Sequence, residues 1–495
     1  MNSSPTRVVV AGGGTAGWIA ATALVRQLGR LVQVTLVESD DIGTIGVGEA
    51  TIPTARTFHE YLRIDERAFM RATQATFKLG IAFEDWGRIG DRYFHSFGTA
   101  PLNSWVAGFQ HFWLHARDQG YGGELGDYYP ELLAGLGNRF AHGAEPPLNY
   151  AYHLDAGLYA RFLRRIAEND GCRRVEGKIA RVEQHPDGDI AALHLENGER
   201  IDGDLFIDCT GFRALLIEKT LGVDYVDWRH WLPNDGAWAV QTDAVADAAP
   251  YTRALAHDSG WQWRIALQHR VGNGLVFCGD HISVDSARDR LLAMVVGTPR
   301  TEPRLIRFVP GKRRRVWERN CVALGLSSGF VEPLESTSIH LFMIGITRLI
   351  QMFPFGSTGA ALRERYNQIA DNEIDRVRDF VILHFKLSER DDSGYWRMCR
   401  ALDVPDTLKE RIALFAESAQ AWQASDDLFR VDSWIQVMLG QRLQPKAWHK
   451  VAELMAPGQL KGMLEQIRGQ VAQQVATLPP HQTFVERYCA EQTHA

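Results

Sequence analysis

The chain has 495 residues and a formal net charge of −6, from 54 Lys and Arg against 60 Asp and Glu. This balance argues against a polyanion partner, so we expect no nucleic-acid binding. The six cysteines form no C-x-x-C pair, which predicts reduced thiols in a cytoplasmic protein and no metal centre. No apolar run reaches membrane-spanning length, and the length predicts two or three structural units.

The first predicted elements are a strand, a tight turn and a helix near the N-terminus. A β-branched run precedes Gly12, Gly14 and Gly17 in G-x-G-x-x-G spacing, and an Ala-rich helix follows. Glycines at these positions let the backbone approach a pyrophosphate, which binds the free N–H groups of the helix. The next apolar run ends in Glu38, where an acid that binds ribose hydroxyls is expected. The pattern predicts a dinucleotide site.

The stretch from this site to residue 113 contains a loop, a helix and many aromatic residues. Residues 40–53 mix Gly with Ile and Val, which indicates a loop that straps a cofactor. Residues 55–80 are predicted to be helical and end at Lys78, a lysine between apolar neighbours. Such lysines usually extend to solvent, and a catalytic role is the alternative. The aromatic residues after it are typical of a core, or of a flat slot for a ring substrate.

The middle of the chain predicts an α/β pattern over 150–220 and a strand-rich region over 225–310. Residues 260–267 alternate as a strand, with a hairpin expected through Gly272 to Gly274. The basic run 312–315 predicts a solvated entry into a strand.

A second anion-binding element is predicted after a buried strand that ends at Gly325. A loop of small residues leads into an apolar helix, which Ser336 or Thr337 is expected to cap. The first N–H groups of this helix, near Thr337 and Ser338, form an anion site. Glu335 could act beside that site, or only stabilise the helix end. Residues 360–495 are predicted to be helical.

Taken together, several stretches resemble the flavin-dependent halogenases of the tryptophan-halogenase type. They are Gly12–Trp18, Gly46–Pro53, Lys78, Trp261-x-Trp263-x-Ile265, Phe330–Leu341 with its Glu-Pro-Leu-Glu-Ser-Thr core and, more loosely, Ser433–Gln441. The resemblance implies an α/β fold, with a two-dinucleotide-fold, flavin monooxygenase-like FAD domain of mixed sheets over 1–345. It also implies a helical domain over 346–495 that caps the substrate site.

The same resemblance implies a reaction. A separate flavin reductase supplies FADH2, and halide held near Thr337 and Ser338 is oxidised to hypohalous acid. The acid reaches Lys78, which holds it by a hydrogen bond or as a haloamine. Glu335 orients the lysine or takes the proton of the halogenated ring. Trp261 and Trp263 match the signature thought to keep substrate away from the flavin, so their direct role would be packing.

The resemblance further implies which residues contact each ligand. For FAD they are Gly12, Gly13, Gly14, Thr15, Ala16, Gly17, Glu38, Val47, Gly48, Ala50, Ile179, Leu326 and Ile339. For an aromatic small-molecule substrate they are His95, Phe97 and Ser336.

Three departures from the family pattern refine these expectations. Ala266 stands where the family usually has Pro, and Ser338 stands where tryptophan halogenases often carry Gly. Because of Ser338 we expect a weak halide site that favours bromination over chlorination. Residues 430–450 lack the adjacent tyrosines that hold the amino-acid end of tryptophan, so the expected substrate is an electron-rich ring such as indole. The alternatives are an aromatic monooxygenase and a noncatalytic flavin-binding or redox-sensing protein, and a homodimer is left open.

Overall fold

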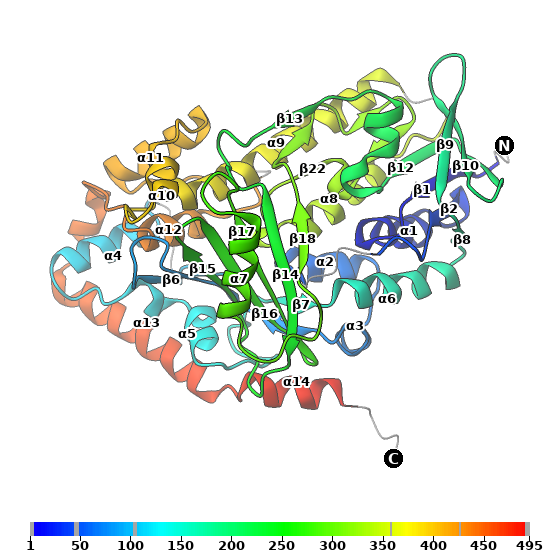
Figure 1. Cartoon of the computed structure of the whole chain (residues 1–495). Coiled ribbons are helices and arrows are strands. Elements are labelled where there is room, and N and C mark those ends of the chain that lie inside the picture. Colours follow the sequence, from blue (N-terminus) through cyan, green and yellow to red (C-terminus); the bar gives the residue numbers. More distant parts are fainter. Residues whose placement is uncertain (1–3, 44–48, 102–105, 357–358, 425–426, 491–495) are drawn as a thin grey trace. The chain divides into compact units, whose positions relative to one another are not determined.

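The computed structural model describes residues 4–43, 49–101, 106–356, 359–424 and 427–490 (Figure 1). The chain forms two compact units, each assembled from three separate stretches. Unit 1 comprises Met1–Ala75, Leu154–Arg229 and Phe308–Asp375, and unit 2 comprises Thr76–His153, His230–Arg307 and Arg376–Ala495. These boundaries differ from a division at residue 345, and a helical domain over 346–495 stays a prediction.

Unit 1 contains the predicted dinucleotide fold and the predicted anion-binding helix. Its strands are β1 (Thr6–Ala11), β2 (Val32–Glu38), β3 (Glu49–Ala50), β8 (Arg173–Glu176), β9 (Ile179–Gln184), β10 (Ile190–Leu195), β11 (Arg200–Asp202), β12 (Leu205–Asp208), β13 (Tyr225–Asp227), β19 (Gly311–Arg313), β20 (Trp317–Glu318), β21 (Cys321–Ala323) and β22 (Gly329–Phe330). Its helices are α1 (Thr15–Leu28), α2 (Thr54–Tyr61), α3 (Glu66–Thr73), α6 (Ala156–Asn169), α8 (Ser338–Gln351) and the first part of α9 (Ala360–Lys386), with short 3-10 turns at Gly325–Ser327 and Pro333–Glu335.

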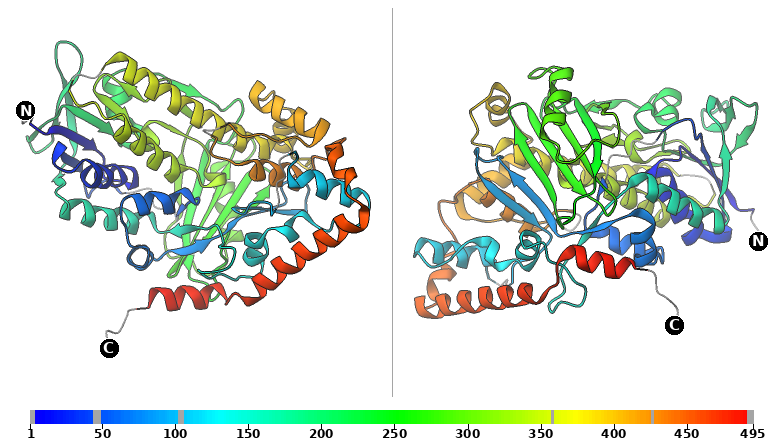
Figure 2. Two further views of the ribbon diagram at one scale, coloured as in Figure 1. Left: turned by 180° about the vertical axis from the view of Figure 1, so that it is seen from behind. Right: turned by 60° about the horizontal axis from the view of Figure 1, so that its bottom comes forward.

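The main sheet of unit 1 has the strand order β20-β21-β12-β1-β2-β8, and all its pairs are parallel except β20 with β21. Helix α1 packs against α6 and α8 (Figures 1 and 2). Val9 and Ala11 of β1 pack instead against Ile190 and Leu193 of the antiparallel sheet β9–β11. Because both faces of the main sheet are covered, the last four residues of β1 form an unbroken, buried apolar run.

Unit 2 is built on a seven-stranded sheet of order β18-β14-β17-β16-β15-β5-β6. The strands of this sheet are β5 (Gly80–Glu84), β6 (Arg92–Ser96), β14 (Gly236–Asp243), β15 (Thr252–His257), β16 (Gly260–Ala266), β17 (Arg270–Phe277) and β18 (Arg304–Arg307). The strands β4 (Thr76–Lys78) and β7 (Ala151–Leu154) pair with each other outside this sheet. The helices of unit 2 are the second part of α9, α4 (Phe109–Asp118), α5 (Pro130–Leu136), α7 (Val284–Met294), α10 (Gly394–Ala401), α11 (Asp406–Ser418), α12 (Val431–Gly440), α13 (Pro457–Thr477) and α14 (His481–Cys489). Helix α13 packs against α4 and α5 (Figure 2).

Two local predictions are wrong. Residues 55–80 are not one helical segment, because the chain passes from α2 and α3 into the strand β4. The hairpin after β16 turns at residues 267–269, and Gly272 to Gly274 lie inside β17. Gly274 is needed there because a Cβ at this position would lie 2.0 Å from the ring of Trp263. The glycine serves close packing and not a turn.

Candidate active site

The glycine turn between β1 and α1 has the shape that a dinucleotide requires. Gly12 has a φ of +107°, and a Cβ there would lie 2.3 Å from the carbonyl oxygen of Cys209. Gly14 is the N-cap of α1, and the space beside its Cα is open. The N–H groups of the first helical turn, Thr15 to Gly17, therefore border a cradle that a side chain at residue 14 would fill.

Glu38 lies directly over this turn. A Cβ at Gly13 would come 1.6 Å from Glu38 Oε2, so only glycine leaves room for the carboxylate. Trp18 Nε1 donates to Oε2 at 3.3 Å, and Arg174 Nε donates to Oε1 at 2.6 Å. The carboxylate is thus fixed with oxygen lone pairs beside the cradle, which fits an acceptor for ribose hydroxyls.

The other residues expected to contact FAD lie in several parts of unit 1. Val47 and Gly48 fall outside the described residues. Ala50 is buried in β3, and Ile339 is buried in α8. Ile179 begins β9 and packs on the core behind the main sheet, while Leu326 lies in the 3-10 turn after β21. Their contacts with a flavin stay a prediction.

The start of α8 contains a buried hydroxyl group, that of Thr337. Thr337 is the N-cap of this helix and is completely buried, but its side chain makes no capping hydrogen bond. Its φ and ψ of −86° and −14° are helical, whereas a capping residue normally has extended backbone. Among the described residues, Thr337 Oγ1 has no hydrogen-bond partner. The prediction that Thr337 caps α8 with its side chain is therefore wrong.

The two residues before Thr337 are buried as well. Ser336 adopts a φ of +60°, a left-handed conformation that costs a non-glycine residue about 1–3 kcal/mol. Glu335 ends the preceding 3-10 turn and is 1% exposed. A helix N-terminus and an unpaired hydroxyl group in one place match the donors that an anion requires.

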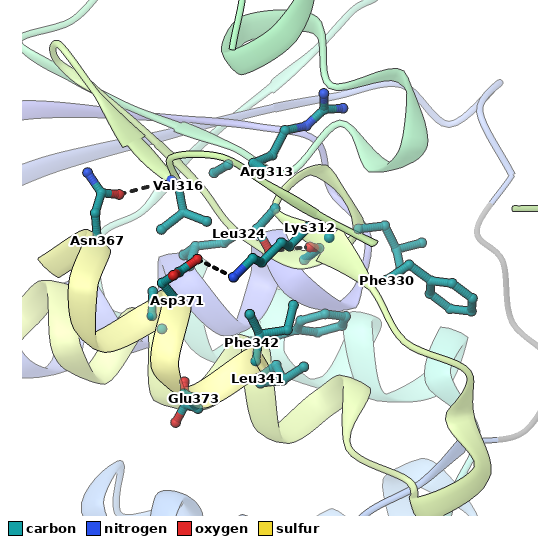
Figure 3. A pocket seen from close by; sticks show the side chains of 18 of the residues that line it. Lys312, Arg313, Val316, Leu324, Phe330, Leu341, Phe342, Asn367, Asp371 and Glu373 are labelled. Carbon is teal, nitrogen blue, oxygen red and sulfur yellow. Dashed lines mark hydrogen bonds and ion pairs between the residues drawn. The ribbon is translucent and has the colours of Figure 1, made fainter. Parts of the chain in front are cut away.

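A pocket in unit 1 lies beside the same helix (Figure 3). Leu326 and Ser338, two of the predicted site residues, are part of its lining. In Figure 3 the Lys312 side chain points to Asp371, with which it forms an ion pair. Arg313 Nη2 pairs with Glu218 at 2.5 Å, and both cations are less than a tenth exposed. The prediction that this basic run is solvated is wrong for these two residues, because carboxylates far along the chain neutralise them.

Lys78 lies in unit 2, on β4. Its side chain is completely buried, so the expectation that it extends to solvent is wrong. Its Nζ lies 5.3 Å from the ring centroid of Phe97, in cation–π geometry. The next residue, Leu79, donates its N–H to Pro250 O at 2.8 Å and accepts from Phe97 N–H at 3.0 Å. Burial of an ammonium group is costly, which favours a functional role for Lys78.

His95, at the end of β6, belongs to an aromatic cluster in the same unit. Its ring lies 5.5 Å from that of Phe380, and the Phe380 ring stacks on Phe429 at 3.7 Å. Trp434 of α12 meets Phe380 edge-on at 4.9 Å. These flat apolar walls around His95 fit the predicted slot for a ring substrate.

Sequence reasoning missed the residue that holds this cluster's strand. Gln436 of α12 accepts hydrogen bonds from Ser96 N and Oγ, both at 2.9 Å, and donates to Ser96 O at 3.3 Å. Ser96 stands between His95 and Phe97, and β6 is the last of the described strands on this side of its sheet, so Gln436 makes hydrogen bonds of the kind that a further strand would make. The only signal in the sequence is that Gln436 lies within the loosely matching stretch Ser433–Gln441.

Trp261 and Trp263 lie on β16 as predicted, and both are buried. Ala266, which replaces a proline of the family pattern, accepts a hydrogen bond from Thr76 Oγ1 at 2.8 Å. Thr76 begins β4, so this contact helps to hold the strand that bears Lys78. Lys78 belongs to unit 2 and Glu335 to unit 1, and their pairing stays a prediction.

Metal-ligating clusters and membrane-spanning helices were both looked for among the residues that the structure describes. These residues contain no group of three His, Cys, Asp or Glu side chains that could hold a metal ion. None of the described helices combines the length and the apolar character needed to cross a bilayer.

Comparisons with known proteins match this chain to one family. The model of the family described as tryptophan halogenase matches residues 7–457. Tryptophan 6-halogenase SttH of Streptomyces toxytricini is 39% identical over 444 residues, 83% of each chain. Tryptophan 7-halogenase RebH of Lentzea aerocolonigenes is 37% identical over 452 residues, 86% of this chain and 85% of RebH.

Solved structures agree with the sequence matches. Xcc4156, a flavin-dependent halogenase from Xanthomonas campestris, superposes with a TM-score of 0.97 at 53% identity, covering 100% of both chains. BrvH, a flavin-dependent halogenase from Brevundimonas sp. BAL3, gives 0.94 at 42% identity over 98% of this chain and 99% of its own. The predicted resemblance and the α/β fold class are confirmed. The chain therefore belongs to the tryptophan halogenase family and is a flavin-dependent halogenase.

Proposed function

We propose that this enzyme uses FADH2 from a separate flavin reductase, with O2 and halide, to halogenate an electron-rich aromatic ring such as indole. The observation that carries the proposal is the completely buried Lys78 ammonium group against the Phe97 ring. Bound reduced flavin supplies the electrons with which O2 and halide form hypohalous acid. The glycine cradle under Glu38 would hold the dinucleotide part of that cofactor.

In this proposal the buried lysine positions the oxidant. Lys78 Nζ donates a hydrogen bond to hypohalous acid beside the ring substrate, which lies along His95 and Phe97. A ring carbon forms a bond to the halogen while the halogen–oxygen bond breaks and the oxygen leaves as hydroxide. The ring then loses its proton, and the Glu335 carboxylate accepts it.

The proposed halide site is the N-terminus of α8. Thr337 Oγ1 and the first N–H groups of the helix would donate to the anion. A Cβ at Ser338 restricts the backbone more than glycine does, so we expect a weak site. Bromide is less tightly hydrated and more easily oxidised than chloride, and so tolerates a weak site better. With equimolar bromide and chloride, we expect mostly brominated product by isotope pattern; mostly chlorinated product would contradict this.

The substrate is tested by comparing free indole with tryptophan at equal concentration. Indole should be halogenated faster, because residues 430–450 lack adjacent tyrosines for an amino-acid group. Tryptophan is the second candidate, since SttH and RebH are tryptophan halogenases by name. A clear preference for tryptophan would overturn the choice of indole.

The role of Lys78 is tested with Lys78→Met, which keeps an apolar stem of similar length and removes the charge. Lys450→Met, at a mostly exposed lysine, is the matched control. Ring halogenation should fall at least about 10²-fold in Lys78→Met. FAD binding and formation of hypohalous acid, captured by a 1,3-diketone trap, should continue. Ring halogenation near the wild-type rate would refute the assignment.

A further inference from the structure

The strand that bears Lys78 is held by a residue from the far end of the chain. Among the described strands of its sheet, β4 lies at the edge, and it pairs with β7 in antiparallel register. An edge strand leaves alternate N–H and C=O groups without a strand partner. The N–H of Phe77, directly before Lys78, is such a group, and it donates to His481 Nε2 at 3.2 Å.

The imidazole of His481 completes a ladder between two backbone segments. Leu79 N–H donates directly to Pro250 O at 2.8 Å. Two residues earlier on each segment, the His481 ring lies between the two backbones and bridges them. Phe77 N–H donates to its Nε2, and its Nδ1 lies 2.7 Å from Ala248 O. Because Nε2 accepts, the proton must be on Nδ1, which donates to Ala248.

The surroundings keep this ring neutral. Burial lowers the pKa of His481 to about 4, so the ring remains an acceptor at neutral pH. The ring is completely buried. Phe77 stacks on Phe140 at 4.2 Å, and Phe484 of α14 lies 5.7 Å from Phe77.

We propose that His481 is a positioning residue that fixes the backbone on the N-terminal side of Lys78. The family model matches residues 7–457, so His481, the first residue of α14, lies outside the matched region. The inference rests on the proposed role of Lys78. A shift of about 1 Å in a reacting group can cost about 10²-fold in rate, so loss of the bridge should reduce the chemical step.

The test compares His481→Phe, which keeps a ring but removes both hydrogen bonds, with Phe484→Leu, which loosens α14 but keeps the bridge. Halogenation kcat should fall at least about 10-fold in His481→Phe, with substrate KM within about twofold. The amount of hypohalous acid that His481→Phe forms, measured with the 1,3-diketone trap, should not decrease. Phe484→Leu should lower Tm about as much as His481→Phe does, but it should keep kcat within about twofold of wild type.

A third variant, His481→Gln, supplies a donor and an acceptor on one amide and should restore part of kcat. If His481→Phe does not fold, His481→Gln carries the comparison, with a kcat between those of wild type and Lys78→Met. An unchanged kcat, or equal losses in the His481 and Phe484 variants, would overturn the inference. Lys78→Met run in parallel separates the two claims. If Lys78→Met abolishes halogenation and His481→Phe leaves halogenation unchanged, only the role of His481 is refuted. If Lys78→Met is active, the proposed function is refuted and this inference with it.

Discussion

Replacement of Thr337 by valine should strengthen the fold and weaken the halide site. The hydroxyl group is completely buried at the start of α8 and has no hydrogen-bond partner among the described residues. A buried unpaired polar group costs about 1–3 kcal/mol, and valine keeps the branched shape without it. In halide-free buffer the free energy of unfolding should therefore rise by about 1 kcal/mol, which corresponds to a Tm increase of about 1 °C for a chain of 495 residues.

The effect on halide binding should have the opposite sign. A hydrogen bond from a hydroxyl group to an anion contributes about 1.5–3 kcal/mol, so its loss should raise the bromide KM about 10- to 100-fold. Initial halogenation rates against bromide concentration measure this, and thermal unfolding in a sulfate buffer measures stability.

Thr73→Val is the matched control. Thr73 is also completely buried, but its Oγ1 donates to Phe69 O at 2.8 Å. Removal of this satisfied bond should lower stability by about 1 kcal/mol and leave the bromide KM unchanged. If Thr337→Val lowers Tm as Thr73→Val does and the bromide KM stays at the wild-type value, the assignment of a halide site to this hydroxyl group is refuted.

Three further changes test other parts of the site. Glu335→Gln should reduce kcat about 10²-fold, while Glu332→Gln, at a buried carboxylate three residues earlier, should not; a loss below about threefold at Glu335 would leave it only a structural role. Gly13→Ala should weaken FAD binding in a titration at least about 10-fold, since its Cβ would lie 1.6 Å from the Glu38 carboxylate; unchanged affinity would argue against the cradle. Burial lowers the pKa of His340 to about 4, so the folded state binds fewer protons than the unfolded state between pH 4 and 6.5. Stability should therefore fall with acidification, and His340→Gln should flatten urea-derived stability against pH by about 1.4 kcal/mol per unit; an unchanged slope would contradict this.

Glycine can mark either a tight turn or a closely packed position inside a strand, and the sequence alone does not separate these two roles. Gly12 to Gly17 were expected to form a tight turn, and the structure confirms that turn. Gly272 to Gly274 carry the same signal for a turn but lie within a strand. The difference is the Trp263 ring on the neighbouring strand, which occupies the space of a side chain at Gly274.

The candidate site was predictable where its function depends on backbone close in sequence. The glycine turn, Glu38 on the next strand and the start of α8 near Thr337 follow from local spacing, because strand, turn and helix there are neighbours along the chain. The same pattern carried the family resemblance. Sequence therefore determined the fold class, the dinucleotide cradle and the candidate anion site.

Tertiary structure decided the environments of the buried charged and polar groups. Local pattern placed Lys78 at the end of a helix reaching solvent, but pairing with β7 puts it on a buried strand. Lys312 was expected in water, but Asp371 lies 59 positions further along the chain and neutralises it inside the protein. His481 contacts Phe77 across 404 positions. Only three-dimensional packing brings such partners together. A polar group can be buried where a group from a distant part of the chain forms a hydrogen bond or ion pair with it.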